Sequence, residues 1–101
     1  MARYRKTLQT RVRRRRTLDE PLLVGQFHRN RRGEVVRVSL STYENRNICD
    51  VRVYFTGKDG LPLPTKKGVC ISVLRIPELL AALTKAQQQS VDLGLVEPEG
   101  A

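Results

Sequence analysis

The sequence predicts an α+β domain in which four antiparallel strands are followed by one helix. Two stretches, residues 34–43 and 48–56, alternate between apolar and polar side chains on either side of a short polar turn. A helical spacing of apolar residues appears only afterwards, in residues 73–89. The chain has 101 residues, a length typical of a single domain.

The first two strands flank an arginine-rich turn. Residues 22–27 form the first expected strand, and residues 28–33 form a polar turn with three arginines. Alternation in "EVVRVSLSTY" divides the second strand between two faces. Its apolar face carries Val36, Val38 and Leu40, and its polar face carries Arg37, Ser39, Ser41 and Tyr43.

The third strand pairs with the second as an antiparallel hairpin through the turn "ENRN". Its apolar face holds Cys49, Val51, Val53 and Phe55, and its polar face holds Asp50, Arg52 and Tyr54. Residues 57–68 contain three glycines and two prolines, which predicts a loop. The next four residues, "VCIS", are expected to form a short, buried fourth strand.

The helix is expected within "VLRIPELLAALTKAQQQ", with Ser72 as a candidate N-cap. Because Pro77 comes late for a first turn after Ser72, the alternatives are a start nearer Arg75 or a kink. The apolar stripe consists of Ile76, Leu79, Leu80 and Leu83. One amphipathic helix leaves apolar surface and strand edges exposed in a chain of this length. A homodimer that covers them is therefore predicted, with this stripe at its interface.

Charge divides the chain into three regions. Residues 1–20 carry eight basic residues without a hydrophobic period, and are interpreted as a disordered basic arm. Four roles are open for this arm: a solubilising tail, a nucleic-acid tether, a nuclear import signal and a transit peptide. Residues 21–88 form the folded domain, which is basic by itself, and residues 89–101 form a loose acidic tail.

The net charge of +9 and the pI near 10.4 predict a polyanionic partner, of which nucleic acid is the commonest. An anionic membrane surface is the rival partner, although nucleic acid is preferred and no membrane partner is expected. No apolar run approaches the length of a spanning helix. No secretory signal is visible, and an intracellular location is expected: cytoplasm or nucleoid in a bacterium, nucleus in a eukaryote. Cys49 and Cys70 could pair in a disulfide, but they are interpreted as reduced thiols in the core.

Catalysis is not expected. His28 is the single histidine and has no evident acid beside it, and no metal or cofactor motif is present. Asp50 and Arg52 share one strand face two residues apart, which favours a structural ion pair over general-base chemistry. "GKDG" lacks the spacing of a phosphate-binding loop.

The polar sheet face is the strongest functional signal. Single-stranded nucleic acid is bound by cations that follow its phosphates and by rings that stack on its bases. The candidate rings are Tyr43 and Tyr54, and the candidate cations are Arg37, Arg46, Arg52, Lys66 and Lys67. The alternative is an ordinary solvated face with two tyrosines that favour strands.

Residues 24–86 resemble the C-terminal domain of the positive cofactor four family, transcriptional coactivators that bind single-stranded DNA. The resemblance is carried by "VRVSLSTYENRNICDVRVYF", a following "DG", "PTKKGVCISV" and "PELLAALTKA". It implies a curved four-stranded sheet and a homodimer whose two antiparallel grooves suit unpaired strands, as in melted duplex. The implied site residues are Tyr43, Arg46, Arg52, Phe55, Lys66 and Lys67.

Three departures from the family pattern stand out. Glu44 occupies a turn position that is often basic in the family, and Phe55 replaces a tryptophan. Alternation also places Phe55 on the apolar face. The arm is rich in arginine instead of serine and acid, so regulation by its phosphorylation is not implied.

The resulting hypothesis is a sequence-tolerant single-stranded DNA-binding protein that acts as a transcriptional coactivator or in DNA maintenance. Two alternatives remain: a small RNA-binding protein, and an adaptor that recruits RNA polymerase or repair proteins. An enzyme is the last choice, because no nucleophile or metal site is found.

Overall fold

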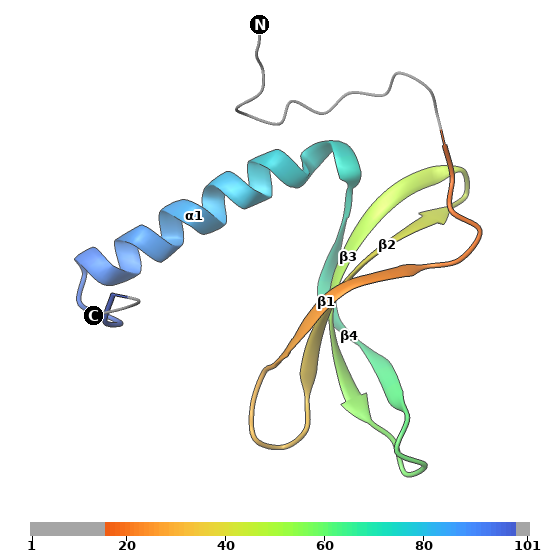
Figure 1. Ribbon diagram of the computed structural model, residues 1–101, viewed down its shortest axis with the longest axis horizontal. Helices are drawn as coiled ribbons and strands as arrows, with labels where there is room; N and C mark the ends of the chain where they lie inside the picture. Colours follow the sequence, from red (N-terminus) through yellow and green to blue (C-terminus); the bar gives the residue numbers. More distant parts are fainter. Residues whose placement is uncertain (1–15, 99–101) are drawn as a thin grey trace, which may run out of the picture. The chain divides into compact units, whose positions relative to one another are not determined.

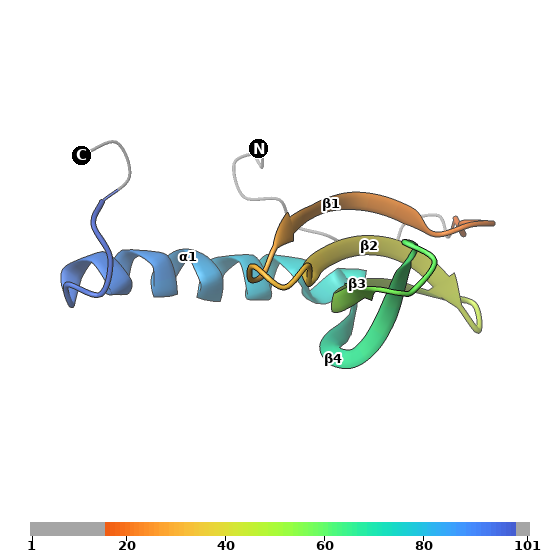
Figure 2. The ribbon, with the colours of Figure 1, turned by 90° about the horizontal axis from the view of Figure 1, so that it is seen from below.

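A computed structural model describes residues 16–98, which fall into two units: the sheet up to Val73 and the helical segment from Leu74 (Figure 1). The strands are β1 (Leu22–His28), β2 (Val35–Tyr43), β3 (Arg46–Thr56) and β4 (Pro62–Ser72). They form one antiparallel sheet in the order β1-β2-β3-β4, which confirms the predicted fold class. The strands bow along their length (Figure 2).

The β2–β3 hairpin has an unbroken register from Val35 opposite Tyr54 to Tyr43 opposite Arg46. Its turn is shorter than the "ENRN" cluster suggested. The turn consists of Glu44 and Asn45, which lie between the paired Tyr43 and Arg46 and have φ angles of 51° and 66°. Positive φ at both central residues is the geometry that matches strand twist in two-residue hairpins. This tight turn fixes the register, and with it the face on which every side chain lies.

Strand β4 differs most from the prediction. The expected loop over residues 57–68 ends at Leu61, and β4 begins at Pro62 and continues for 11 residues. Prolines are tolerated here because β4 is an edge strand, where one side makes no ladder hydrogen bonds. The same edge position explains why the expected burial of "VCIS" is wrong: Val69 is 47% exposed, and Cys70 is exposed rather than part of a core.

The core of the sheet lies on one face of β3, which pairs with β2 on one side and with β4 on the other. Among the described residues, only Cys49 and Val53 are buried apolar side chains. Both belong to the apolar face, on which the register also places Val36, Leu40 and Val51. The opposite surface, called the polar face, carries Arg37, Ser39, Tyr43, Arg46, Asp50, Arg52 and Tyr54.

The helical segment starts later and ends later than the sequence pattern placed it. A 3-10 turn, η2 (Val73–Arg75), precedes α1 (Ile76–Asp92), and Arg75 is the N-cap. Ser72 is therefore not the cap, and the later start, with Pro77 in the first turn, is confirmed. Beyond Asp92, Gly94 adopts a φ of 76° and the Leu95 N–H donates to the Ser90 carbonyl, which ends the helix.

Over residues 16–98, no helix is long and apolar enough to cross a membrane. Most of the predicted arm, residues 1–15, lies outside the described residues. Its last part is attached to the hairpin. The Leu18 N–H donates to Thr42 Oγ1 at 2.8 Å, and Asn47 Nδ2 donates to the Arg16 carbonyl at 2.6 Å.

Candidate nucleic-acid interface

Five of the eight predicted binding residues share the polar face of the sheet. Residues directly opposite one another in an antiparallel pair project from the same side. Arg37 lies opposite Arg52, and Tyr43 lies opposite Arg46. Tyr54 lies opposite Val35, two positions along β2 from Arg37, and so projects from this side too.

The hairpin end of this face presents a ring beside a cation. Tyr43 closes β2 and is 65% exposed, and Arg46 opens β3 directly across from it and is also exposed. Neither forms an ion pair within residues 16–98. Glu44, in the turn between them, is exposed and opposes phosphate binding at the very tip. The tip therefore combines one accessible stacking surface with one unneutralised guanidinium group.

The second ring, Tyr54, is already covered by an arginine. The guanidinium carbon of Arg37 lies 4.9 Å from the centre of the Tyr54 ring, which is a cation–π distance. Arg37 Nε also donates to Gln26 Oε1 at 3.0 Å. Arg37 is thus fixed over Tyr54 by two contacts, and it leaves that ring less surface for a base than Tyr43 has.

Arg52 and Asp50 form the ion pair that the sequence predicted. Arg52 Nε donates to Asp50 Oδ2 and Arg52 Nη2 donates to Asp50 Oδ1, both at 2.9 Å. Arg52 Nη1 donates to the Thr65 carbonyl at 3.0 Å. The hydrogen bonds to Asp50 raise the pKa of Arg52 further, so its guanidinium stays charged. The pair is nearly neutral, so Arg52 offers a phosphate less than a free arginine does.

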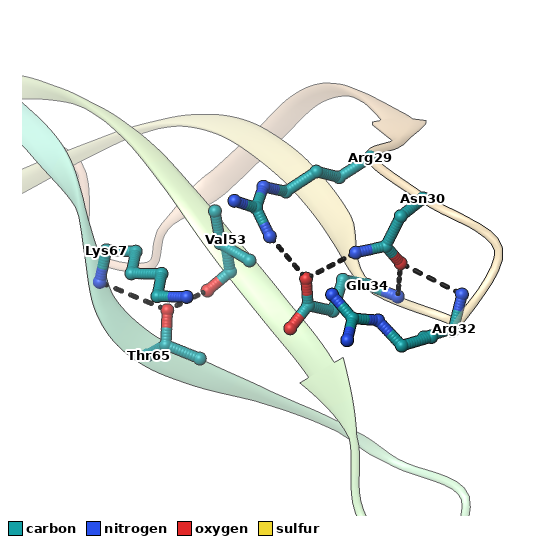
Figure 3. Close-up of polar contacts among 7 residues, drawn as sticks. All are labelled: Arg29, Asn30, Arg32, Glu34, Val53, Thr65 and Lys67. Atoms are coloured by element: carbon teal, nitrogen blue, oxygen red, sulfur yellow. Dashed lines mark hydrogen bonds and ion pairs between the residues drawn. The ribbon is translucent and has the colours of Figure 1, made fainter.

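A bulge in β4 brings the two predicted lysines into the sheet. Val53 of β3 lies opposite the stretch between Pro64 and Gly68, where the register shifts. Thr65 holds the bulge: its hydroxyl donates to the Val53 carbonyl at 2.7 Å and accepts the Lys67 N–H at 3.1 Å (Figure 3). The loop prediction over these residues missed this ordered position.

The two lysines face different electrostatic surroundings. Lys66 is exposed and forms no ion pair within residues 16–98. The pKa of Glu34 is lowered mainly by its hydrogen bonds with Asn30 and Arg29, and the charge of Lys67 adds to this effect. Lys67 is also exposed and forms no ion pair in this range, so both lysines can contact a phosphate.

Phe55 does not join the tyrosines. The β2–β3 register is unbroken, and the bulge lies on the β4 side, so nothing turns Phe55 onto the polar face. It lies opposite Leu63 on the apolar face and is 42% exposed. Within one sheet, the residue set implied by the resemblance is divided between two faces.

Sequence reasoning did not identify two features that shape this face: Gly68 and the β1–β2 loop. A Cβ on Gly68 would lie 2.5 Å from the Val51 carbonyl oxygen and 2.8 Å from the Arg52 Cα, so only glycine allows β4 to approach there. The β1–β2 loop contributes further arginines at the opposite end from Tyr43. The residues "NRRG" predict a turn there, but they do not predict which hydrogen bonds and ion pairs the loop forms.

The thiols and the histidine do not assemble a reactive centre. Both cysteines are free, and burial raises the pKa of the Cys49 thiol, which makes it a poor nucleophile. His28 is an exposed residue at the end of β1. Within residues 16–98, no three side chains of the metal-binding types come together.

The helix stripe is uneven in exposure. Ile76 and Leu79 are half-buried, whereas Leu80 is 59% and Leu83 is 58% exposed. Exposed leucines at this spacing form an apolar surface on α1. The predicted role of all four residues in dimerisation stays a prediction.

An antiparallel four-stranded sheet with a basic, ring-bearing face, followed by one helix, defines a class of small sheet-based proteins. Within this class, the family model described as Transcriptional Coactivator p15 (PC4) matches residues 30–82. The match spans just over half of the chain, and the protein belongs to this family.

Two crystal forms of one solved homolog show the same fold. A PC4 homolog from Burkholderia pseudomallei K96243 is 22% identical, with a TM-score of 0.62 over 71% of this chain and 96% of that one in its orthorhombic crystal form. In its tetragonal form the TM-score is 0.61, over 67% and 98%. A bacteriophage T5 homolog of the coactivator, implicated in recombination-dependent DNA replication, is 20% identical with a TM-score of 0.48, over 78% and 84%. Among curated proteins, no sequence matches.

Proposed function

We propose that the protein binds single-stranded DNA, tolerant of its sequence, through the polar face of its sheet. The observation that carries the proposal is the hairpin end, where the exposed ring of Tyr43 lies across from Arg46, a cation with no ion pair among the described residues. Duplex DNA keeps its bases stacked on one another, so an exposed ring has bases to stack on only where the partner strand is missing. Membership of the PC4 family supports the proposal.

The free cations supply the charge and the ring supplies the selectivity. Within residues 16–98, Arg46 and Lys66 form no ion pair, and Arg37 keeps its charge above Tyr54. Phosphate contacts of this kind bind any nucleic acid and weaken as salt rises. Stacking adds about 1–3 kcal/mol per base without reading the sequence, and it distinguishes single strands from duplex.

The functional unit in this proposal is a homodimer. The exposed Leu80 and Leu83 of α1 and the open edges of β1 and β4 are surfaces that a second copy would cover. Two copies of the polar face then bind two unpaired strands, such as those of a melted duplex.

The process that fits a protein of this family is transcription, with the protein as coactivator, or DNA maintenance. In either case it is an intracellular binding protein rather than an enzyme, and it recruits RNA polymerase or repair proteins as partners. Its contribution would be to hold unpaired strands open by stacking and charge.

A titration tests the proposal. Fluorescence anisotropy measures affinity for single-stranded DNA, duplex and single-stranded RNA of equal length at two salt concentrations. The proposal expects the single-stranded DNA to bind most tightly, with the preference retained at the higher salt. Equal affinity for duplex and single strand would contradict it, and tighter binding of RNA would favour the RNA-binding alternative.

A further inference from the structure

The β1–β2 loop, residues 29–34, is held in one conformation by its own contacts, and is here called the arginine loop (Figure 3). Asn30 Oδ1 accepts the N–H groups of Arg32 at 2.9 Å and Glu34 at 3.4 Å. The Arg29 N–H donates to the Glu34 carbonyl at 2.8 Å, and Gly33 takes a φ of 89°. The loop is therefore ordered before any ligand arrives.

The charges of the arginine loop are divided unequally. Glu34 Oε1 accepts from Arg29 Nη1 at 2.5 Å and from Asn30 Nδ2 at 2.7 Å (Figure 3). These bonds neutralise Arg29. Arg31 and Arg32 are exposed, and within residues 16–98 neither forms an ion pair. The loop thus presents the guanidinium groups of two consecutive residues, neither of which has a carboxylate partner within residues 16–98.

Two free guanidinium groups without a ring are suited to phosphate and not to bases. The fork of a guanidinium matches two phosphate oxygens, and the ordered backbone of the loop fixes the positions from which the two arginines extend. The arginine loop contains no aromatic residue, so it adds charge without stacking. A duplex exposes its phosphates and hides the faces of its bases. A surface that has cations but no ring can therefore bind a duplex with every contact it offers.

The arginine loop lies at the far end of the sheet from Tyr43. Strand β2 joins them with nine residues, which corresponds to a path of about 26 Å at the usual rise per residue. A phosphate site here is separate from the ring at the hairpin end, and one DNA molecule has to extend along the sheet to reach both.

We propose that Arg31 and Arg32 of the arginine loop bind the phosphates of duplex DNA that flanks the single strand on the polar face. The protein would then recognise a junction between unpaired and paired DNA. The junction part of this proposal rests on the proposed function, whereas the duplex contact of the loop is measurable by itself.

The experiment compares the double variant Arg31→Ala, Arg32→Ala with Arg75→Ala, Lys85→Ala, which removes two exposed charges from the helical segment. Each is titrated with a single strand, a blunt duplex and a duplex carrying a single-stranded tail. For the loop variant, the duplex salt slope should fall by about 0.9 per lost contact. Its affinity for the tailed duplex should drop to that for the single strand alone, while single-strand affinity changes less than twofold.

A second variant separates the position of the arginines from their charge. Asn30→Ala keeps Arg31 and Arg32 but removes the cap that orders the loop, so a smaller loss on duplex is expected, with single-strand binding unchanged. Circular dichroism confirms that each variant folds.

Two outcomes overturn the loop assignment. If the loop variant loses affinity equally for single strand and duplex, the loop belongs to the single-strand track. If it matches the Arg75, Lys85 control on every substrate, the loop is only a solvated surface. A parent protein with no preference for single strands would defeat the proposed function, and the duplex slopes would still decide the role of the loop.

Discussion

Replacing Tyr43 with alanine isolates stacking from every other property of the polar face. The side chain is 65% exposed at the end of β2, so its loss removes little packing and should change the free energy of unfolding by less than about 0.5 kcal/mol. If the ring stacks on a base, single-strand affinity should fall by about 1–3 kcal/mol. That corresponds to about 5- to 140-fold in the dissociation constant.

The assay is fluorescence anisotropy with a single strand of about 20 nucleotides, long enough for the usual footprint of such surfaces, over a salt series. Tyr43→Phe is the matched control, because it keeps the ring and should bind like the parent. Tyr54→Ala should lose less than Tyr43→Ala, because Arg37 already covers that ring. The salt slope of Tyr43→Ala should equal that of the parent. A folded Tyr43→Ala protein with parental affinity would refute the stacking argument.

Four further predictions concern charge, packing and assembly. Arg46→Ala should flatten the single-strand salt slope by roughly 0.7, and Arg52→Ala by less, because Asp50 already neutralises it. Gly68→Ala should destabilise the domain by about 1–3 kcal/mol in a denaturant titration, since its Cβ would overlap the Val51 carbonyl. The pKa of Glu34 is lowered in the folded protein, so the ionised carboxylate stabilises the fold. This contribution to the free energy of unfolding is complete at pH values above the ordinary pKa of 4.5, and it is lost as the pH falls through the lowered pKa. Glu34→Gln should therefore flatten the acid limb of a stability–pH curve, and an unchanged limb would contradict this. Leu80→Glu should dissociate the predicted dimer in sedimentation, whereas a compact parent monomer at micromolar concentration would rule the dimer out.

The hairpin could be predicted because its information is local. A period of two in β2 and β3 assigns each side chain to a face, and a short turn sets the register. From these two facts the sequence yields the polar face and the Asp50–Arg52 pair, since residues two apart on a strand project from the same side. Nothing distant is needed for either inference.

What the sequence could not provide depends on contacts between strands. The prolines and glycines of β4 predict a loop when the sequence is considered alone. They are tolerated in a strand because β4 lies at the edge of the sheet, and this position is known only from the folded structure. The bulge at Thr65 requires knowledge of the Val53 carbonyl across the ladder. Likewise, the cover of Arg37 over Tyr54 and the order of the arginine loop arise from side chains that meet only after folding.

The most direct test of the polar face is side-chain NMR during titration with a single-stranded oligonucleotide. The ring protons of Tyr43 should shift upfield as a base stacks on them, and the Nε–H signals of Arg37 and Arg46 should move with the same midpoint. The methyl signals of Val36 and Val51, on the apolar face, should stay in place. Shifts confined to the apolar face or to α1, with the Tyr43 ring unchanged at saturation, would contradict the account.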